Sequence, residues 1–315
     1  MASPLIIAHR GASGYLPEHT LEAKALAYGQ GADYLEQDVV ATRDDRLVVL
    51  HDLWLDRVTD VALHYPERRR ADGHWYVRDF DLAELRVLNV HERRDEAGQA
   101  QFPGRFPTDA GRFRIATLEE ELELVRGLNR ATGRRVGVYP EIKEPAWHRA
   151  EGVDIAALLL SHLADFGWQR RDDPVFVQCF DPGELKRLRD ELHTDLKLVQ
   201  LLADDAWGEA ATDHAALQTP AGLDALARTV DGIGPWLGQL QRLAPIDGQP
   251  LSTGLAEAAR ERGLVVHPYT FRADALPPGF ADFGALVGWF ARELAVDGLF
   301  TDFPDRARAI LERLP

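Results

Sequence analysis

The amino-acid sequence predicts an α/β protein with a TIM-type (β/α)8 barrel. Short apolar runs typical of buried parallel strands recur along the chain, and amphipathic segments with helix-start signals lie between them. These runs give about eight strand positions, which is the number that the barrel requires. Several runs also end in ionisable residues, and barrels carry their ligands at the carboxyl ends of their strands.

The predicted elements alternate up to residue 52 and again after residue 114. The predicted strands span residues 5–8, 34–40, 47–50, 136–142, 174–179, 196–202, 230–234, 264–270 and 296–300. The predicted helices span residues 20–30, 117–130, 150–166, 252–262 and 283–294, with further helices after Pro182 and Pro304. Thr20 and Thr117 are candidate N-caps, and the glutamates at 119–121 favour the first turn of the helix that begins at Thr117.

Residues 53–114 interrupt this alternation. The segment is rich in Arg, Asp, Gly, Pro and aromatic residues and predicts only a short helical piece near 81–88. We interpret it as an insertion after the third strand, packed over one mouth of the barrel. The sequence therefore predicts a single barrel domain over 1–315 with an insertion at about 53–114.

Composition narrows the classes of function. A net charge of −15 argues against nucleic-acid binding, and the only sizeable basic cluster, Arg68–Arg70, favours a solvated loop. The single cysteine, Cys179, excludes an intrachain disulfide and a cysteine zinc site. No apolar run approaches the length of a membrane span. An acidic protein that handles an anionic substrate needs local compensation, which a divalent cation would supply.

The compartment is left open by the amino terminus. The chain begins Met1-Ala2-Ser3-Pro4 and enters its first strand at once, without a signal-peptide pattern. As it stands the sequence indicates the cytoplasm, whereas the periplasm is expected if an export signal has been removed. Whether the protein forms a homodimer is also left open.

Three carboxylates follow or lie on predicted strands. Glu36 and Asp38 are two residues apart, so they project to the same face of their strand, and Glu141 lies on a later strand. Such a pair is costly to bury without a cation or a shared proton. Together the three form an all-oxygen ligand set that favours one Mg²⁺, Ca²⁺ or Mn²⁺ ion over zinc.

Two histidines and two cations lie at strand ends beside them. Arg10 suits a phosphate or carboxylate, and Lys143 shares a face with Glu141. His9 and His51 could be metal ligands, but two histidines that flank a metal-bound anion suit general acid–base work better.

Several motifs together resemble the glycerophosphodiester phosphodiesterases. They are His9-Arg10-Gly11, Pro17-Glu18-His19-Thr20, Glu36-Gln37-Asp38, His51-Asp52, Glu141-Ile142-Lys143, Gln178-Cys179-Phe180 and Thr301-Asp302-Phe303-Pro304. The resemblance runs from Ile6 to Pro304 and is strongest to the bacterial periplasmic branch. His19 departs from the wider family, in which many members carry Asn.

The resemblance implies metal-dependent hydrolysis of small glycerophosphodiesters, such as glycerophosphocholine or glycerophosphoethanolamine, to sn-glycerol 3-phosphate and an alcohol. It implies that Glu36, Asp38 and Glu141 hold the metal, while Arg10 and Lys143 bind the phosphate. It gives the acid–base pair as His9 and His51, and we assign His9 as the base.

The resemblance also bears on the pocket and the route. Gln178 and Phe180 are expected to line the pocket, and Tyr269 and Trp289 either contact the substrate or belong to the core. Water attacks phosphorus directly, or the glycerol 2-hydroxyl attacks first and gives a cyclic phosphate. We favour the second route because the family resembles the phosphoinositide phospholipases C. A phospholipase D-like hydrolase of lysophospholipids or sphingolipids is the alternative function, and a non-enzymatic binder of anions is disfavoured because every expected site residue is present.

Overall fold

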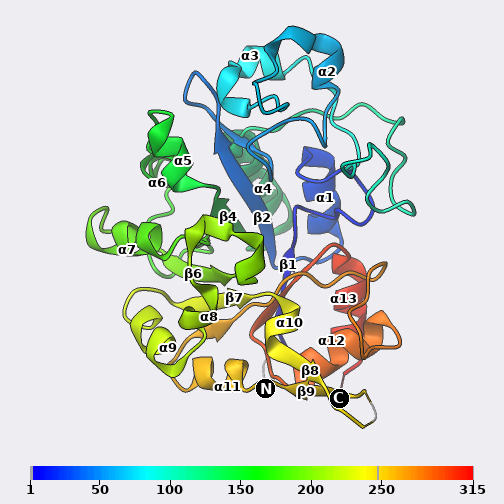
Figure 1. The fold of residues 1–315 in the computed structure, drawn as a ribbon, viewed down its shortest axis with the longest axis vertical. Helices are drawn as coiled ribbons and strands as arrows, with labels where there is room; N and C mark the ends of the chain where they lie inside the picture. Colours follow the sequence, from blue (N-terminus) through cyan, green and yellow to red (C-terminus); the bar gives the residue numbers. More distant parts are fainter. Residues whose placement is uncertain (1–2, 247, 315) are drawn as a thin grey trace.

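Eight parallel strands form a barrel in the computed structural model, which describes residues 3–246 and 248–314 (Figure 1). In chain order these strands are β1 (Leu5–Ala8), β2 (Tyr34–Ala41), β4 (Gly137–Ile142), β5 (Phe176–Cys179), β6 (Lys197–Leu202), β7 (Gly232–Pro235), β10 (Val265–Val266) and β11 (Gly298–Thr301). They are almost entirely buried because helices cover the outside and side chains fill the inside. The predicted TIM-type barrel is confirmed.

The barrel closes between its last two strands through backbone hydrogen bonds. The Asp297 amide donates to the Val266 carbonyl at 3.0 Å, and the Phe300 amide donates to the Pro268 carbonyl at 3.0 Å. We expected a strand over 264–270, but only Val265–Val266 is regular. Pro268 has no amide hydrogen to contribute to the ladder, so the chain beyond it follows β11 irregularly.

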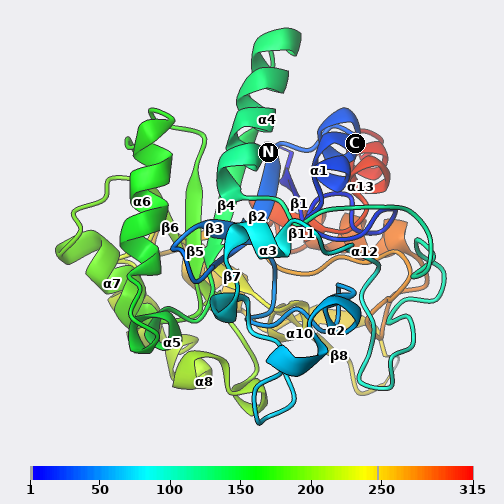
Figure 2. The ribbon, with the colours of Figure 1, turned by 90° about the horizontal axis from the view of Figure 1, so that it is seen from above.

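Helices surround the strands (Figure 2). The helices are α1 (Leu21–Gly29), α2 (Val61–His64), α3 (Leu82–Leu85), α4 (Leu118–Thr132), α5 (Pro145–Ala150), α6 (Ile155–Asp165), α7 (Pro182–Asp190), α8 (His214–Leu217), α9 (Pro220–Leu226), α10 (Leu237–Leu240), α11 (Leu255–Arg260), α12 (Phe283–Arg292) and α13 (Pro304–Leu311). Both predicted N-caps are confirmed: Thr20 accepts a hydrogen bond from the Ala23 amide, and Thr117 accepts one from the Glu120 amide within a capping box.

The strand that carries His51 lies outside the barrel. This strand, β3 (Leu47–Val49), pairs with β2 in the antiparallel direction and is not part of the ring. We expected its end to be one of the carboxyl ends at the barrel mouth. Instead β3 turns back along β2, and the Leu50 amide donates to the Asp38 carbonyl at 3.0 Å. This return, rather than a parallel strand, brings the following histidine to the mouth.

The insertion packs around an apolar cluster of its own. The cluster includes Val48 of β3 together with Leu55, Phe80 and Leu85, all of which are fully buried or nearly so. The short helix predicted near 81–88 is present as α3. The insertion therefore extends from β3 as a packed layer, drawn in cyan in Figure 1.

Two other elements differ from the sequence-based expectation. The helix expected over 150–166 is present as α6, which begins at Ile155 because the Asp154 side chain caps it, and the unpredicted helix α5 precedes it and ends before Gly152, which adopts φ 84°. An unpredicted antiparallel hairpin, β8 (Gln241–Leu243) and β9 (Pro250–Ser252), follows α10.

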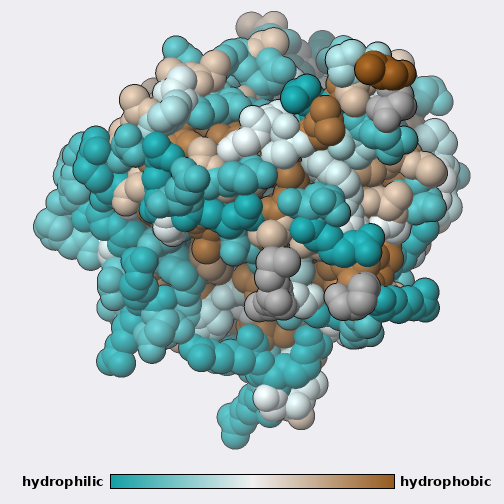
Figure 3. All heavy atoms as spheres, turned by 90° about the horizontal axis from the view of Figure 1, so that it is seen from below, coloured by the Kyte–Doolittle hydropathy of each residue, from teal (hydrophilic) through white to brown (hydrophobic). Residues whose placement is uncertain are grey.

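The surface is mostly polar on the face drawn in Figure 3, where apolar residues gather only in small patches between polar ones. Among the described residues, none of the helices has both the length and the apolar character needed to cross a bilayer.

Candidate active site

A cavity of about 330 Å³ opens at the carboxyl ends of the barrel strands. Nine of the residues singled out from the sequence line it: His9, Arg10, Glu36, Asp38, His51, Glu141, Gln178, Phe180 and Tyr269. Its floor includes Phe300, which packs inside the barrel with Tyr139 and Phe176. The strands thus bring residues from β1 to β11 into one cavity, as the fold class predicts.

The two remaining residues predicted for the site, Lys143 and Trp289, do not line the cavity. Lys143 is buried beside the cavity, and its Nζ donates to Glu141 Oε1 at 2.7 Å. Trp289 does not line the cavity. It lies on α12, where it packs against Phe280 and Phe290 outside the barrel, so its role is in the core. Apolar helix faces that pack outside a barrel are rich in aromatic residues, and the sequence alone does not distinguish them from a pocket wall.

His9 is held by a carboxylate from the last barrel strand. Its Nδ1 lies 2.6 Å from Asp302 Oδ1, and Asp302 Oδ2 accepts hydrogen bonds from Arg105 at 2.7 Å and Arg272 at 2.9 Å. Burial, and then the charge of Arg10, lowers the pKa of His9 to about 4, so the ring is neutral near pH 7. Because Nδ1 is engaged by the carboxylate, Nε2 is the nitrogen free to exchange a proton.

His51 has a matching arrangement. Its Nδ1 lies 2.6 Å from Asp52 Oδ1, and Asp52 Oδ2 accepts a hydrogen bond from Arg93 at 2.6 Å. Burial, followed by the charges of Arg10 and Lys143, lowers the pKa of His51 to about 4. The site therefore contains two pairs of a neutral histidine and an ionised aspartate, and an arginine from the insertion donates to each aspartate.

The pKa values of the two β2 carboxylates, Glu36 and Asp38, are shifted in opposite directions. Burial and the neighbouring Asp38 raise the pKa of Glu36 well above its ordinary value. Burial alone would also raise the pKa of Asp38, but the adjacent His19 and Lys143 hold it well below the usual range. Burial and then Asp38 raise the pKa of Glu141 to about 8, against the opposing charge of Lys143. Adjacent buried carboxylates compete for positive charge in this way when no cation lies between them.

Arg10 is fixed by its backbone as well as its side chain. It adopts φ 58°, in the left-handed region, and this conformation directs its amide to Glu36 Oε2 at 2.5 Å. Its guanidinium donates to both oxygens of Glu18 at 3.1 Å, while its buried Nε has no hydrogen-bond partner. Nε lies 3.5 Å from Asp38 Oδ2, so the guanidinium is also ion-paired with the carboxylate cluster.

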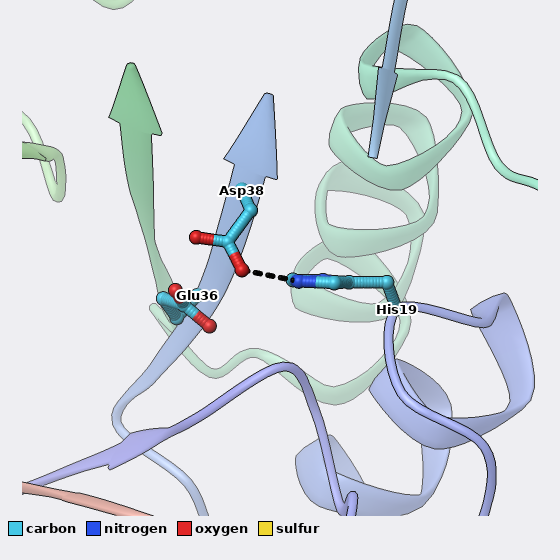
Figure 4. A group of neighbouring side chains, drawn as sticks. All are labelled: His19, Glu36 and Asp38. Atoms are coloured by element: carbon cyan, nitrogen blue, oxygen red, sulfur yellow. Dashed lines mark hydrogen bonds and ion pairs between the residues drawn. The ribbon is translucent and has the colours of Figure 1, made fainter. Parts of the chain in front are cut away.

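His19 also contacts the carboxylate cluster, through a hydrogen bond to Asp38 (Figure 4). Its Nε2 donates to Asp38 Oδ2 at 2.7 Å, and burial lowers the pKa of the ring to about 3. His19, Glu36 and Asp38 can offer ligand atoms within 4.8 Å of one another, whereas Glu141 enters the site from β4, paired in register with Asp38. The sequence showed His19 only as a departure from the family pattern. Only the structure reveals that His19 contacts Asp38.

The donor set fits a divalent cation. Asp38 Oδ1 is buried without a hydrogen-bond partner, next to Glu36, whose charge is disfavoured by Asp38. Carboxylate oxygens are the ligands preferred by Mg²⁺ and Ca²⁺, and a cation would satisfy both the orphaned oxygen and the repulsion.

Sequence reasoning missed several cavity residues. Trp236 and Arg272 follow strands β7 and β10 closely, so their position just beyond a strand end was a usable signal. Trp207 lies in an irregular segment after β6, and Arg93 and Arg105 come from the insertion. No local pattern marks those three. His267 lies within the strand expected over 264–270, but it is buried inside the barrel and hydrogen-bonded through Nδ1 to the Tyr139 hydroxyl at 2.9 Å.

The fold and the site define a barrel enzyme whose mouth combines two His–Asp pairs, a carboxylate cluster and two buried cations. The model of the glycerophosphoryl diester phosphodiesterase family matches residues 9–306. The chain belongs to this family and is an enzyme of it.

Two curated relatives and one solved structure also support membership of this family. A glycerophosphodiester phosphodiesterase of Haemophilus influenzae is 43% identical over 96% of this chain and 88% of its own length. One of Treponema pallidum is 38% identical over 96% of this chain and 90% of its own. The crystal structure of a candidate glycerophosphoryl diester phosphodiesterase from Silicibacter pomeroyi superposes with a TM-score of 0.73 at 25% identity, covering 99% of this chain and 94% of that one.

Proposed function

We propose that the protein hydrolyses glycerophosphodiesters, such as glycerophosphocholine or glycerophosphoethanolamine, to sn-glycerol 3-phosphate and an alcohol with the help of one divalent metal ion. The observation that carries this proposal is the pair of His–Asp units that face one cavity beside Arg10 and the carboxylate cluster. The related Haemophilus and Treponema proteins are glycerophosphodiester phosphodiesterases by name, and family membership supports the same reaction class.

The metal would be held by Glu36, Asp38 and Glu141, with His19 orienting Asp38 through its hydrogen bond. When bound, Ca²⁺ or Mg²⁺, or Mn²⁺ in their place, supplies positive charge that polarises the phosphoryl oxygens. Arg10 and Lys143 supply further positive charge for the same oxygens. Arg10 Nε makes no hydrogen bond and lies 3.5 Å from Asp38 Oδ2, so its positive charge lies beside the proposed metal ligands.

The histidines move the protons. His9, neutral and held by Asp302, takes the proton of the attacking hydroxyl, and His51 gives a proton to the oxygen of the departing alcohol. Burial, followed by the charges of Arg10 and Lys143, lowers the pKa of His51, and a bound phosphate offsets these two charges. Substrate binding thus favours the protonated form that His51 needs as an acid.

The attacking hydroxyl in our proposal belongs to the glycerol. Its 2-oxygen bonds to phosphorus as the bond to the alcohol oxygen breaks, which leaves a cyclic phosphate. Water then bonds to phosphorus and opens the ring, while His51 accepts the proton of the water and His9 returns its proton to the 2-oxygen. One pair of groups therefore serves both steps with exchanged roles.

The wall of the cavity next to the reacting groups contains both polar and apolar side chains. Gln178 is buried and its Oε1 has no hydrogen-bond partner, so it can accept a hydrogen bond from a substrate hydroxyl. Phe180 and Tyr269 contact one another edge to face, with ring centroids 6.2 Å apart, and offer an apolar surface to the glycerol carbons.

The test is release of sn-glycerol 3-phosphate from glycerophosphocholine after treatment with a chelator and then with Ca²⁺, Mg²⁺ or Mn²⁺ restored. Release that stops with the chelator and returns with one metal supports the reaction and the cofactor together. Release that persists through chelation would reject the metal. Absence of release under every metal, with turnover of a long-chain lysophospholipid instead, would replace this substrate class by the lipid alternative.

A further inference from the structure

A second cavity lies against the active site, and the insertion contributes Arg57, Arg93, Gln101, Phe102 and Arg105 to its lining. It has a volume of about 160 Å³ and shares His9, Arg10, His51 and Arg272 with the main cavity. A phosphodiester has two arms on one phosphorus atom. Because three of the shared residues, His9, Arg10 and His51, are those that we assign to the phosphate and to proton transfer, a phosphate bound among them directs one arm into each cavity.

The second cavity is rich in positive charge, although the whole chain is acidic. Its lining contains five arginines, Arg10, Arg57, Arg93, Arg105 and Arg272. It contains three carboxylates, Glu18, Asp52 and Asp302, and each of them is already ion-paired with one or more of these arginines. An anion that enters the cavity therefore meets guanidinium groups in excess, while the net charge of −15 repels it elsewhere.

Two of these arginines, Arg57 and Arg272, have terminal nitrogens that make no hydrogen bond within the described residues. Within the described ranges the Arg57 side chain forms no ion pair, and its only hydrogen bond is from Nε to the Arg94 carbonyl at 2.9 Å. Arg272 uses Nε for Asp302 and stacks at 5.5 Å from the centroid of Phe102, against which Arg105 also packs at 3.8 Å. The aromatic ring holds these guanidinium planes in place. The terminal nitrogens of Arg57 are the least engaged donors in the lining.

We propose that the second cavity is the head-group subsite and that it favours alcohols that carry an additional negative charge, with Arg57 as the residue that determines this preference. The proposal rests on the proposed hydrolysis of glycerophosphodiesters. Glycerol is neutral and common to every substrate, so it gains little from unpaired guanidinium groups. The head group is the arm whose charge varies, and a charged hydrogen bond to a guanidinium discriminates strongly between anions and cations.

The experiment compares three diesters that differ in head-group charge: glycerophosphocholine (cationic), glycerophosphoglycerol (neutral) and glycerophosphoinositol 4-phosphate (anionic). In Arg57→Gln, kcat/KM for the anionic substrate is expected to fall about tenfold, the effect of losing one charge-assisted hydrogen bond. The value for glycerophosphocholine is expected to stay within about twofold, because Arg57 touches none of the reacting groups. Arg57→Lys keeps the charge and is expected to recover part of the preference.

Arg69→Gln is the matched control. Arg69 is an exposed arginine of the same insertion, lies outside both cavities, and its loss changes the net charge equally. Equal losses on all three substrates in Arg57→Gln, or an equal shift in Arg69→Gln, would overturn the proposal.

A calorimetric titration with myo-inositol 4-phosphate, the alcohol released from the anionic substrate, gives a second readout that does not depend on turnover. Its affinity is expected to fall about tenfold in Arg57→Gln, and unchanged affinity would count against the subsite. If none of the three diesters is hydrolysed by the unmodified protein, the proposed function fails, and this titration still decides the subsite separately.

Discussion

His9 and Asp302 lie 293 residues apart in the chain, yet their Nδ1 and Oδ1 atoms are 2.6 Å apart. The contact joins the end of the first barrel strand to the residue that follows the last one, so it forms only when the barrel closes. The catalytic orientation that we propose for His9 is therefore a product of the complete ring of strands.

Replacing either histidine is expected to abolish most activity without unfolding the protein. In His9→Ala or His51→Ala, turnover of glycerophosphocholine should fall by about 10²–10⁴-fold, the usual contribution of a positioned acid–base group. The thermal unfolding midpoint, measured by circular dichroism, should change little because both rings border a cavity. A near-normal rate in either variant would refute the assignment.

A substrate without the 2-hydroxyl separates the two routes. The analogue in which 1,3-propanediol replaces glycerol cannot form the cyclic phosphate. We expect turnover of this compound to be lost while its binding, measured as competitive inhibition, is kept. Normal release of the alcohol would exclude the cyclic route and leave direct attack by water.

Arg93 is expected to matter for stability as well as catalysis. It is buried and donates to both oxygens of Glu18, at 2.9 and 2.7 Å, and to Asp52 at 2.6 Å. Arg93→Gln leaves these carboxylates short of a partner, and breaking such a buried pair typically costs about 3–5 kcal/mol. Urea unfolding should show this loss, together with reduced turnover because Asp52 orients His51.

Arg43→Gln provides the comparison for Arg93→Gln. Arg43 pairs with Asp81 at 2.6 Å, but its side chain is half-exposed. Solvent screens an exposed pair of this kind, so its loss is expected to change the unfolding free energy far less than the loss of Arg93. Similar losses of unfolding free energy in the two variants would contradict the structural role of Arg93.

His267 is expected to make the fold sensitive to acid. Burial inside the barrel lowers its pKa to about 3, whereas an unfolded chain has the ordinary value of 6.5. Between these values the unfolded state binds a proton that the folded state does not. This residue therefore lowers the unfolding free energy as the pH falls from about 6.5 towards 3.

Denaturant titrations at several pH values measure this effect. The slope that His267 contributes is at most about 1.4 kcal/mol per pH unit. His267→Gln should show a shallower dependence than the unmodified protein between pH 6.5 and 5. Parallel curves for the two proteins would show that His267 does not titrate in this way.

The sequence predicted the barrel and most of its mouth because both depend on local patterns. Apolar runs marked the strands, and residues at their ends, such as Glu36 and Glu141, necessarily meet at one mouth once the strands are parallel. The antiparallel direction of β3 was not predictable, since an apolar run specifies burial but not its partner. Contacts made by the insertion could not be predicted either, because nothing in the sequence next to Arg93 indicates that it contacts Glu18 and Asp52.

The exclusion of β3 from the ring has an evolutionary consequence. No hydrogen bond between barrel strands depends on residues 53–114, and doubling the length of a loop costs only about 0.6 kcal/mol of closure entropy. We expect that the segment can be exchanged as a module, provided that the replacement returns arginines to Glu18, Asp52 and Asp302. Head-group range can then diverge between lineages while the bond-breaking chemistry of the barrel is inherited unchanged.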